Sequence, residues 1–197
     1  MLRSFHPSTP TATLIDADNS AALPADTVWI DLLNPTHAEE QLVERIIGLS
    51  IPTREEMAEI EQSSRLYEEN GAIYMTATVL AGLEINDPIA TPISFVLTNK
   101  HLITVRYADP KPFRFFTDHI ARHPETIGNA MEMLVKLLDA IVDRMADSLE
   151  QVASEIEQIS KSVFRRTTDE MGKRIPDRKS TRLNSSHRNT SRMPSSA

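Results

Sequence analysis

The chain has 197 residues, of which 40% are apolar and 25% are charged, an ordinary balance for a soluble globular protein. It contains no cysteine, which excludes disulfides and thiolate metal sites and fits a reducing compartment. Its formal net charge of −7 argues against binding to a nucleic-acid backbone and leaves attraction of cations open. No run approaches the roughly 20 apolar residues of a membrane-spanning helix, and no signal peptide is expected at the start.

The last 21 residues, 177–197, differ in composition from the rest because they are rich in Ser, Arg and Asn. Such a segment cannot bury enough apolar surface to offset its ordering entropy, so we expect it to be disordered. Its strings DRKSTRLNSSH and SRMPSSA also resemble one reading frame of a sequencing-library adapter. We therefore exclude it from the fold. It holds five basic residues and one acidic residue, so residues 1–176 alone carry a net charge of −11.

The first half of the chain predicts two strands and two capped helices. Residues 12–15 form a possible edge strand, and the β-branched and aromatic run over residues 27–33 predicts a buried strand. Thr36 with Glu39, and Thr53 with Glu56, have the spacing of capping boxes, so a helix is expected after each threonine.

The middle of the chain predicts four more strands and a short helix. The strands are expected at residues 65–67, 72–81, 91–98 and 101–107, and the Asn70-Gly71 pair predicts a hairpin turn. Residues 111–122 predict a helix whose apolar positions are Phe113, Phe116 and Ile120.

A long helix with a heptad-like apolar stripe is the clearest predicted element. The stripe comprises Met131, Leu134, Leu138, Ile141, Met145, Leu149, Val152, Ile156, Ile159 and Val163. A stripe of this length predicts a partner helix, in the same chain or in another subunit. We interpret Met131, Met133 and Met145 as packing residues of this helix rather than as a metal site. The predicted fold is α/β, a mixed sheet with helices on both faces over residues 1–125, followed by a helical arm over residues 126–176.

Several motifs, in the order in which they occur along the chain, resemble motifs of the N-terminal cytoplasmic domain of the CorA family of magnesium and cobalt transporters. They are Trp29–Leu32, Thr53–Glu61 with Arg65–Glu68, Ile93–Leu97, Leu102–Arg106, Leu137–Asp143 and Ser148–Val163. The resemblance implies the α/β fold above and the cytoplasmic regulatory domain of a homo-oligomeric channel in the bacterial inner membrane. Transport of Mg²⁺, and of Co²⁺, would be passive and gated by intracellular Mg²⁺. It also implies a homopentamer and a membrane segment that lies beyond this chain, which has no Gly-Met-Asn motif of the family's pore.

The resemblance places regulatory metal ligands at Glu59 and Asp139. Mg²⁺ takes oxygen ligands and keeps several waters, so one or two carboxylates suffice. Ala58 stands where many members of the family have Glu. The alternative is that both carboxylates are ordinary solvated side chains, since Glu59 lies in a run with Glu55, Glu56 and Glu61.

Two other functions stay open, a zinc transporter of the related ZntB branch and a stand-alone protein that assembles through its long helix. His119 and His123 have the i, i+4 spacing of a zinc pair, but no third ligand is evident nearby. No catalytic or phosphate-binding motif occurs, so we do not expect an enzyme. The basic residues are scattered, which argues against nucleic-acid binding.

Overall fold

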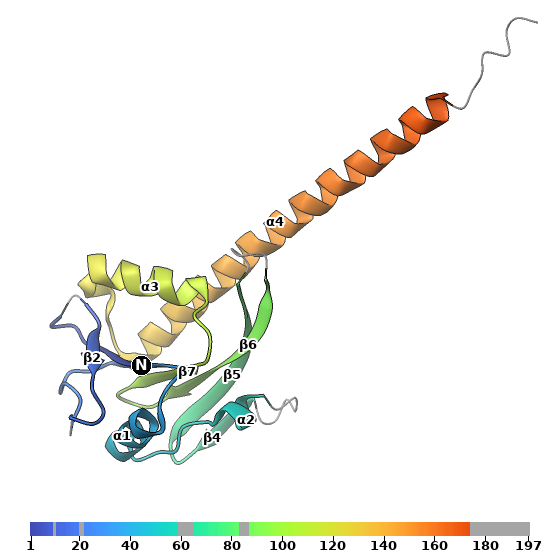
Figure 1. Cartoon of the computed structure of the whole chain (residues 1–197). Helices are drawn as coiled ribbons and strands as arrows, with labels where there is room; N and C mark the ends of the chain where they lie inside the picture. Colours follow the sequence, from blue (N-terminus) through green and yellow to red (C-terminus); the bar gives the residue numbers. More distant parts are fainter. Residues whose placement is uncertain (10, 20–21, 59–64, 83–86, 174–197) are drawn as a thin grey trace, which may run out of the picture. The chain divides into compact units, whose positions relative to one another are not determined.

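The computed structural model of the chain describes residues 1–9, 11–19, 22–58, 65–82 and 87–173, and in residues 165–173 it describes only the backbone (Figure 1). The chain divides into two compact units, Met1–Glu150 and Gln151–Ala197. The first unit holds a seven-stranded sheet. Its strands are β1 (Leu2–Phe5), β2 (Thr13–Ile15), β3 (Trp29–Leu33), β4 (Leu66–Glu69), β5 (Ala72–Ala81), β6 (Ile89–Leu97) and β7 (Leu102–Arg106).

The sheet is mixed, as the sequence predicted. Its strand order is β2-β1-β3-β7-β6-β5-β4. The central strands β3 and β7 run parallel, with Asp31 opposite Thr104, and all other neighbours are antiparallel. The predicted edge strand is confirmed as β2, at one end of the sheet.

Helices cover both faces of the sheet (Figure 1). They are α1 (His37–Ile47), α2 (Arg54–Met57), α3 (Lys111–Arg122), the short 3-10 helix η3 (Pro124–Thr126) and α4 (Ala130–Lys173). On one face, α3 and the first turns of α4 pack over an apolar layer that contains Trp29, Phe95 and Leu102. On the other face, Leu42 of α1 and Met57 of α2 pack over Ile30 and Ile103. This two-sided arrangement confirms the predicted fold class.

Both predicted capping boxes are present. The Thr36 hydroxyl accepts a hydrogen bond from the Glu39 backbone N–H at 3.3 Å, and the Glu39 carboxylate accepts one from the Thr36 N–H at 2.8 Å. The same pair of bonds joins Thr53 and Glu56. Each box satisfies backbone donors that the first turn of a helix leaves without partners. The local sequence thus determines where α1 and α2 begin.

The prediction for the first residues of the chain was incomplete, because it missed β1. This strand forms antiparallel ladders with β2 on one side and β3 on the other. Leu2 and Phe5 are buried on opposite faces of the sheet, in the two separate apolar layers. With only two large apolar residues among its four, β1 depends on its neighbours, which local sequence patterns do not reveal.

The apolar stripe predicted on the long helix is divided between two surfaces of α4. Leu134 and Ile141 are buried in the first unit, together with Met133 and Leu137. By contrast, every residue from 149 to 164 is exposed. Met133 is buried in the first unit, whereas Met131 and Met145 are 52% and 39% exposed and do not pack in its core. The helix therefore belongs to the core of the first unit only through its first turns.

Candidate functional site

A buried ion pair crosses the two parallel strands at the centre of the sheet. Arg106 donates from Nε to Asp31 Oδ1 at 2.9 Å and from Nη2 to Asp31 Oδ2 at 3.0 Å. Arg3 donates from Nη2 to Asp31 Oδ2 at 2.5 Å, and the Thr104 hydroxyl donates to Oδ1 at 2.8 Å. Trp29 Nε1 in turn donates to the Thr104 hydroxyl oxygen at 3.0 Å. These bonds satisfy a fully buried carboxylate.

The charges of this cluster keep Asp31 ionised. Burial alone would raise the pKa of the Asp31 carboxyl, but Arg106 and Arg3 hold it below its ordinary value of 3.8. Burial likewise acts to lower the pKa of Arg106, and the charge of Asp31 outweighs burial and raises it. Asp31 and Arg106 are therefore both charged throughout the physiological pH range.

Arg106 also links the sheet to the start of α3. Its Nη1 donates to Ala108 O at 3.0 Å and to Asp109 Oδ1 at 2.6 Å. Its guanidinium lies over the Phe113 ring, 4.5 Å from the centroid. Phe113 is fully buried in the first turn of α3. The ion pair thus positions α3, which forms one wall of the candidate site.

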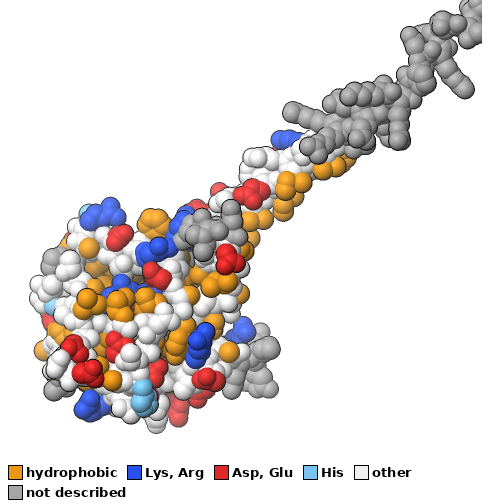
Figure 2. All heavy atoms as spheres, in the orientation of Figure 1, with side chains coloured by type: hydrophobic (Ala, Val, Ile, Leu, Met, Phe, Trp, Pro, Cys, Tyr) orange, Lys and Arg blue, Asp and Glu red, His pale blue; other side chains and the backbone are white. Residues whose placement is uncertain are grey.

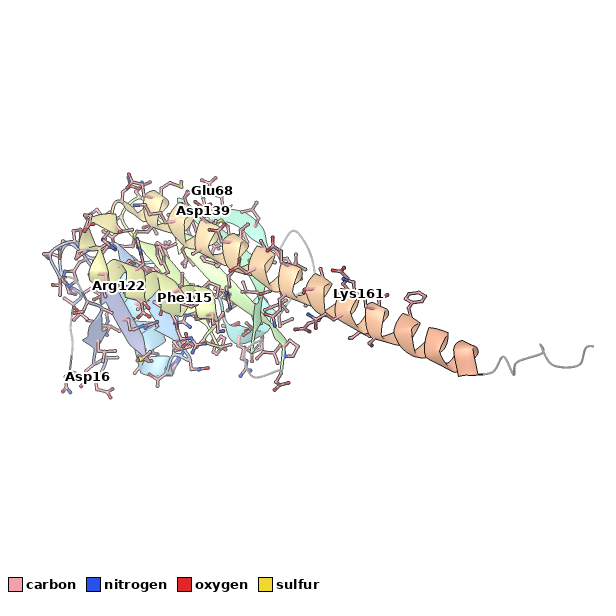
Figure 3. All side chains as sticks on the ribbon, turned by 90° about the horizontal axis from the view of Figure 1, so that it is seen from above. Asp16, Glu68, Phe115, Arg122, Asp139 and Lys161 are labelled. Atoms are coloured by element: carbon pink, nitrogen blue, oxygen red, sulfur yellow. The ribbon has the colours of Figure 1, made fainter. Side chains whose placement is uncertain are left out.

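The candidate site is an open groove of about 570 Å³ between α3 and α4, within the first unit. Figure 3 shows Phe115 and Arg122 on α3 and Asp139 on α4. The lining residues are Phe115, Phe116, His119, Arg122, Thr126, Lys136, Asp139, Ala140 and Asp143. Two phenylalanine rings and side chains of both charges therefore line the groove.

Asp139, one of the two predicted metal ligands, is exposed in this groove. Asp143 lies one helical turn further along α4, on the same face. Neither carboxylate has a hydrogen-bond or ion-pair partner among the described residues. Two carboxylates at this spacing can accept hydrogen bonds from the water shell of a Mg²⁺ ion. Sequence reasoning missed Asp143, although its i, i+4 spacing from Asp139 could have indicated it.

The basic residues of the groove are held partly by backbone carbonyls. Lys136 Nζ donates to Thr126 O at 2.7 Å, and Arg122 Nε donates to Asp118 O at 3.1 Å. These bonds fix a positive charge near the carboxylates. A cation in the groove would be attracted by the carboxylates and repelled by the basic side chains. We therefore expect its binding to be weak and dependent on ionic strength.

Of the other metal-ligand predictions, the structure describes the histidine pair but not Glu59. Glu59 lies outside the described residues, so its position relative to Asp139 is not given. The His119 and His123 rings lie against each other, with centroids 5.0 Å apart, and His123 Nδ1 lies 3.2 Å from Glu125 Oε1. The described part of the chain contains no group of three or more His, Asp or Glu side chains arranged to hold a metal ion.

Comparison with known proteins identifies the relatives of this chain. A family model described as "CorA-like Mg2+ transporter protein" matches residues 24–195. The magnesium transport protein CorA of Wolinella succinogenes is 31% identical over 144 residues, which is 71% of this chain and 45% of that protein. The chain thus spans about half the length of the curated relatives it matches. Within the described ranges, no helix is both long and apolar enough to span a bilayer.

Two solved structures share the fold. The soluble domain of CorA from Methanocaldococcus jannaschii superposes with a TM-score of 0.65 at 17% identity, covering 83% of this chain and 64% of that one. The ZntB cytoplasmic domain from Vibrio parahaemolyticus superposes with a TM-score of 0.52 at 13% identity, covering 78% and 63%. At these identities the similarity establishes the fold alone.

Proposed function

The chain belongs to the CorA-like Mg²⁺ transporter family, and on this premise we propose that it is the cytoplasmic regulatory part of a Mg²⁺ channel. The parent would lie in the bacterial inner membrane, assemble from several copies of itself and let Mg²⁺ pass passively. Intracellular Mg²⁺ bound near Asp139 would favour the closed state. The observation that carries this proposal is the family match over residues 24–195, which includes Asp139.

The groove supports a regulatory role for the cation. Asp139 and Asp143 are exposed, and a bound divalent cation would offset the repulsion between them. A ligand shifts a conformational equilibrium only if it binds one state better than another. A groove that exchanges its cation readily suits such a sensor, because occupancy then follows the free Mg²⁺ concentration.

Magnesium is favoured over zinc as the ion. Zn²⁺ sites usually combine three or four Cys, His or carboxylate ligands. The chain has no cysteine, and its described residues supply no such group. Oxygen ligands with retained waters suit Mg²⁺, and Co²⁺ remains a further candidate for transport within the same family. The 31% identical relative carries the name of a magnesium transport protein.

Thermal unfolding with and without Mg²⁺ tests the regulatory site. Trp29 is the only tryptophan and is fully buried, so its fluorescence reports unfolding of the first unit. A hundredfold excess of Mg²⁺ over its Kd should stabilise the protein by about 2.7 kcal/mol. We expect Asp139→Asn to remove most of this gain. Asp147→Asn, which changes another exposed carboxylate of α4, is the matched control and should retain it.

A chimaera tests transport. Residues 1–176 would be joined to the remaining part of the Wolinella succinogenes relative, and Mg²⁺ uptake would be measured in cells that lack their own transporters. We expect uptake that falls as intracellular Mg²⁺ rises, and weaker inhibition in the Asp139→Asn chimaera. If the rate of Mg²⁺ uptake did not change with intracellular Mg²⁺ in a chimaera shown to reach the membrane, this result would contradict the proposed regulation.

A further inference from the structure

The groove between α3 and α4 contains basic side chains with unused hydrogen-bond donors. Arg122 donates from Nε to Asp118 O at 3.1 Å, and Lys136 donates from Nζ to Thr126 O at 2.7 Å. Among the described residues, neither side chain has a further hydrogen-bond or ion-pair partner. A guanidinium has five N–H donors and an ammonium has three, so most of these donors remain available. His119 lines the same groove. The groove can therefore donate several hydrogen bonds to an anion.

The acidic and basic side chains of the groove do not pair with each other. Asp139 and Asp143 line the groove, yet in the described part of the chain no ion pair joins either carboxylate to its basic side chains. Such an ion pair would neutralise both partners. Because the two signs stay apart, each is available to a ligand. A ligand that combines negative groups with a divalent cation matches this surface.

These groups follow one another along the groove. Lys136 and Arg144 are eight residues apart on α4, about 12 Å along the helix axis, with Asp139 between them. The bond from Lys136 to the segment that follows α3 places Lys136 beside the end of that helix, where Arg122 lies. The Arg144 guanidinium lies over the Phe115 ring, 5.8 Å from its centroid. The groove therefore has a basic end at Arg122 and Lys136 and an aromatic end at Phe115 (Figure 3).

The aromatic end exposes a flat ring to solvent. Phe115 is 56% exposed, whereas the other two phenylalanines of α3 are buried. Basic and hydrophobic side chains lie side by side over α3 (Figure 2). Nucleobases stack on exposed aromatic side chains, and a guanidinium near the ring adds to the attraction. This end of the groove can therefore hold the base of a nucleotide.

The coordination chemistry of Mg²⁺ connects the two ends. Proteins usually bind Mg²⁺ through one or two carboxylates together with phosphates of a ligand, because the ion keeps several waters and rarely occupies a cage of protein ligands alone. The residues that the structure describes contain no group of three or more metal-ligating side chains. Asp139 and Asp143 provide the carboxylates, so phosphate oxygens would complete the ligand set. A polyphosphate remains negative after it binds Mg²⁺, which suits the neighbouring Arg122 and Lys136.

We propose that the groove binds a nucleoside polyphosphate, with its phosphates against Arg122 and Lys136 and its base against Phe115. This inference rests on the proposed function for the Mg²⁺ beside Asp139 and adds the anion that shares this ion. The groove has a volume of about 570 Å³, within the range of about 300–1,000 Å³ that is usual for ligand pockets.

Isothermal titration calorimetry of the full 197-residue chain with ATP tests the basic end. We expect ATP to bind in EDTA, and to bind about tenfold more tightly with excess MgCl₂. Arg122→Gln should weaken ATP binding by at least about tenfold in both conditions, because hydrogen bonds to charged groups are lost. Arg45→Gln is the matched control, since it removes an exposed arginine of α1 on the other face of the sheet, and it should bind ATP like the wild type. Trp29 fluorescence should show the same unfolding transition in both variants.

Inorganic triphosphate separates the contribution of the phosphates from that of the base. Phe115→Ala should weaken ATP binding by about fivefold or more, the effect of losing one stacked base, and should leave triphosphate binding unchanged. Equal binding of ATP and triphosphate to the wild-type chain would overturn the assignment of a nucleoside.

The outcome for the anion is separate from the outcome for Mg²⁺. The inference is overturned if ATP does not bind, or if Arg122→Gln and Arg45→Gln bind it equally well. In that case the proposed function still stands if Mg²⁺ alone stabilises the chain through Asp139. If ATP instead binds through Arg122 equally tightly in EDTA and in MgCl₂, the nucleotide site is supported and the Mg²⁺ site of the proposed function is contradicted.

Discussion

Asp31 and Arg106 join the parallel strands β3 and β7 through two hydrogen bonds, and neither side chain is exposed to solvent. Each residue belongs to one of the motifs on which the family resemblance rests. Because Arg106 also contacts Asp109 and Phe113, the same pair connects the sheet to α3. The groove that holds Asp139 therefore depends on an ion pair in the centre of the fold.

We expect Arg106→Met to destabilise the first unit by about 3–5 kcal/mol, because it leaves the buried Asp31 carboxylate with too few partners. Urea unfolding followed by Trp29 fluorescence measures this loss. Arg114→Met is the matched control, since Arg114 is half exposed and its Nε lies 3.7 Å from Asp109 Oδ2. It should change stability by no more than about 1 kcal/mol. Similar losses in the two variants would contradict the central role of the buried pair.

Acid should destabilise the protein through Asp31. The pKa of its carboxyl lies below 3.8 in the folded protein and near that value in the unfolded chain. The unfolded chain therefore binds more protons, so this contribution to stability is complete above about pH 4 and is lost as the pH falls through the folded pKa. Urea unfolding at a series of pH values should show this loss. In Asp31→Asn, which is less stable at neutral pH, the dependence below about pH 4 should be shallower. Equal slopes would assign the acid sensitivity to other carboxylates.

Local signals predicted most of the elements in this fold. The capping boxes at Thr36 and Thr53 depend on residues three apart, and the hairpin turn at Asn70-Gly71 depends on two neighbours. Such features act within one turn of the chain, so the sequence contains all the residues they need.

Long-range pairing could not be predicted in the same way. The sequence contains both Asp31 and Arg106, but their ion pair follows from the parallel register of β3 and β7, strands that are neighbours in the sheet although β4, β5 and β6 lie between them in the sequence. The stripe of α4 shows the same limit. Periodicity predicted apolar positions, but only the packing against the sheet separates the buried Leu134 from the exposed Met131.

Two phenylalanines of α3, which are two residues apart in the sequence, should respond very differently to truncation. Phe113 is fully buried under Arg106, whereas Phe115 is 56% exposed at the groove. Phe113→Ala should cost about 3–5 kcal/mol in unfolding free energy, because it removes a ring from a packed layer. Phe115→Ala should cost less than about 1 kcal/mol. Chemical unfolding of both variants checks this, and a large loss in Phe115→Ala would show that its ring is packed rather than exposed.

The turn between β4 and β5 requires a left-handed backbone at two successive residues. Asn70 has φ of 50° and Gly71 has φ of 78°, as expected for a hairpin turn of this sequence. A Cβ built on Gly71 meets no atom within 4 Å, so a substitution there is opposed by backbone conformation alone. We expect Gly71→Ala to destabilise the first unit by about 1 kcal/mol. Gly71→Asn should lose less, because asparagine tolerates this conformation better than alanine. Equal losses in urea unfolding would mean that a side chain at this position disturbs packing, and the conformational explanation would then fail.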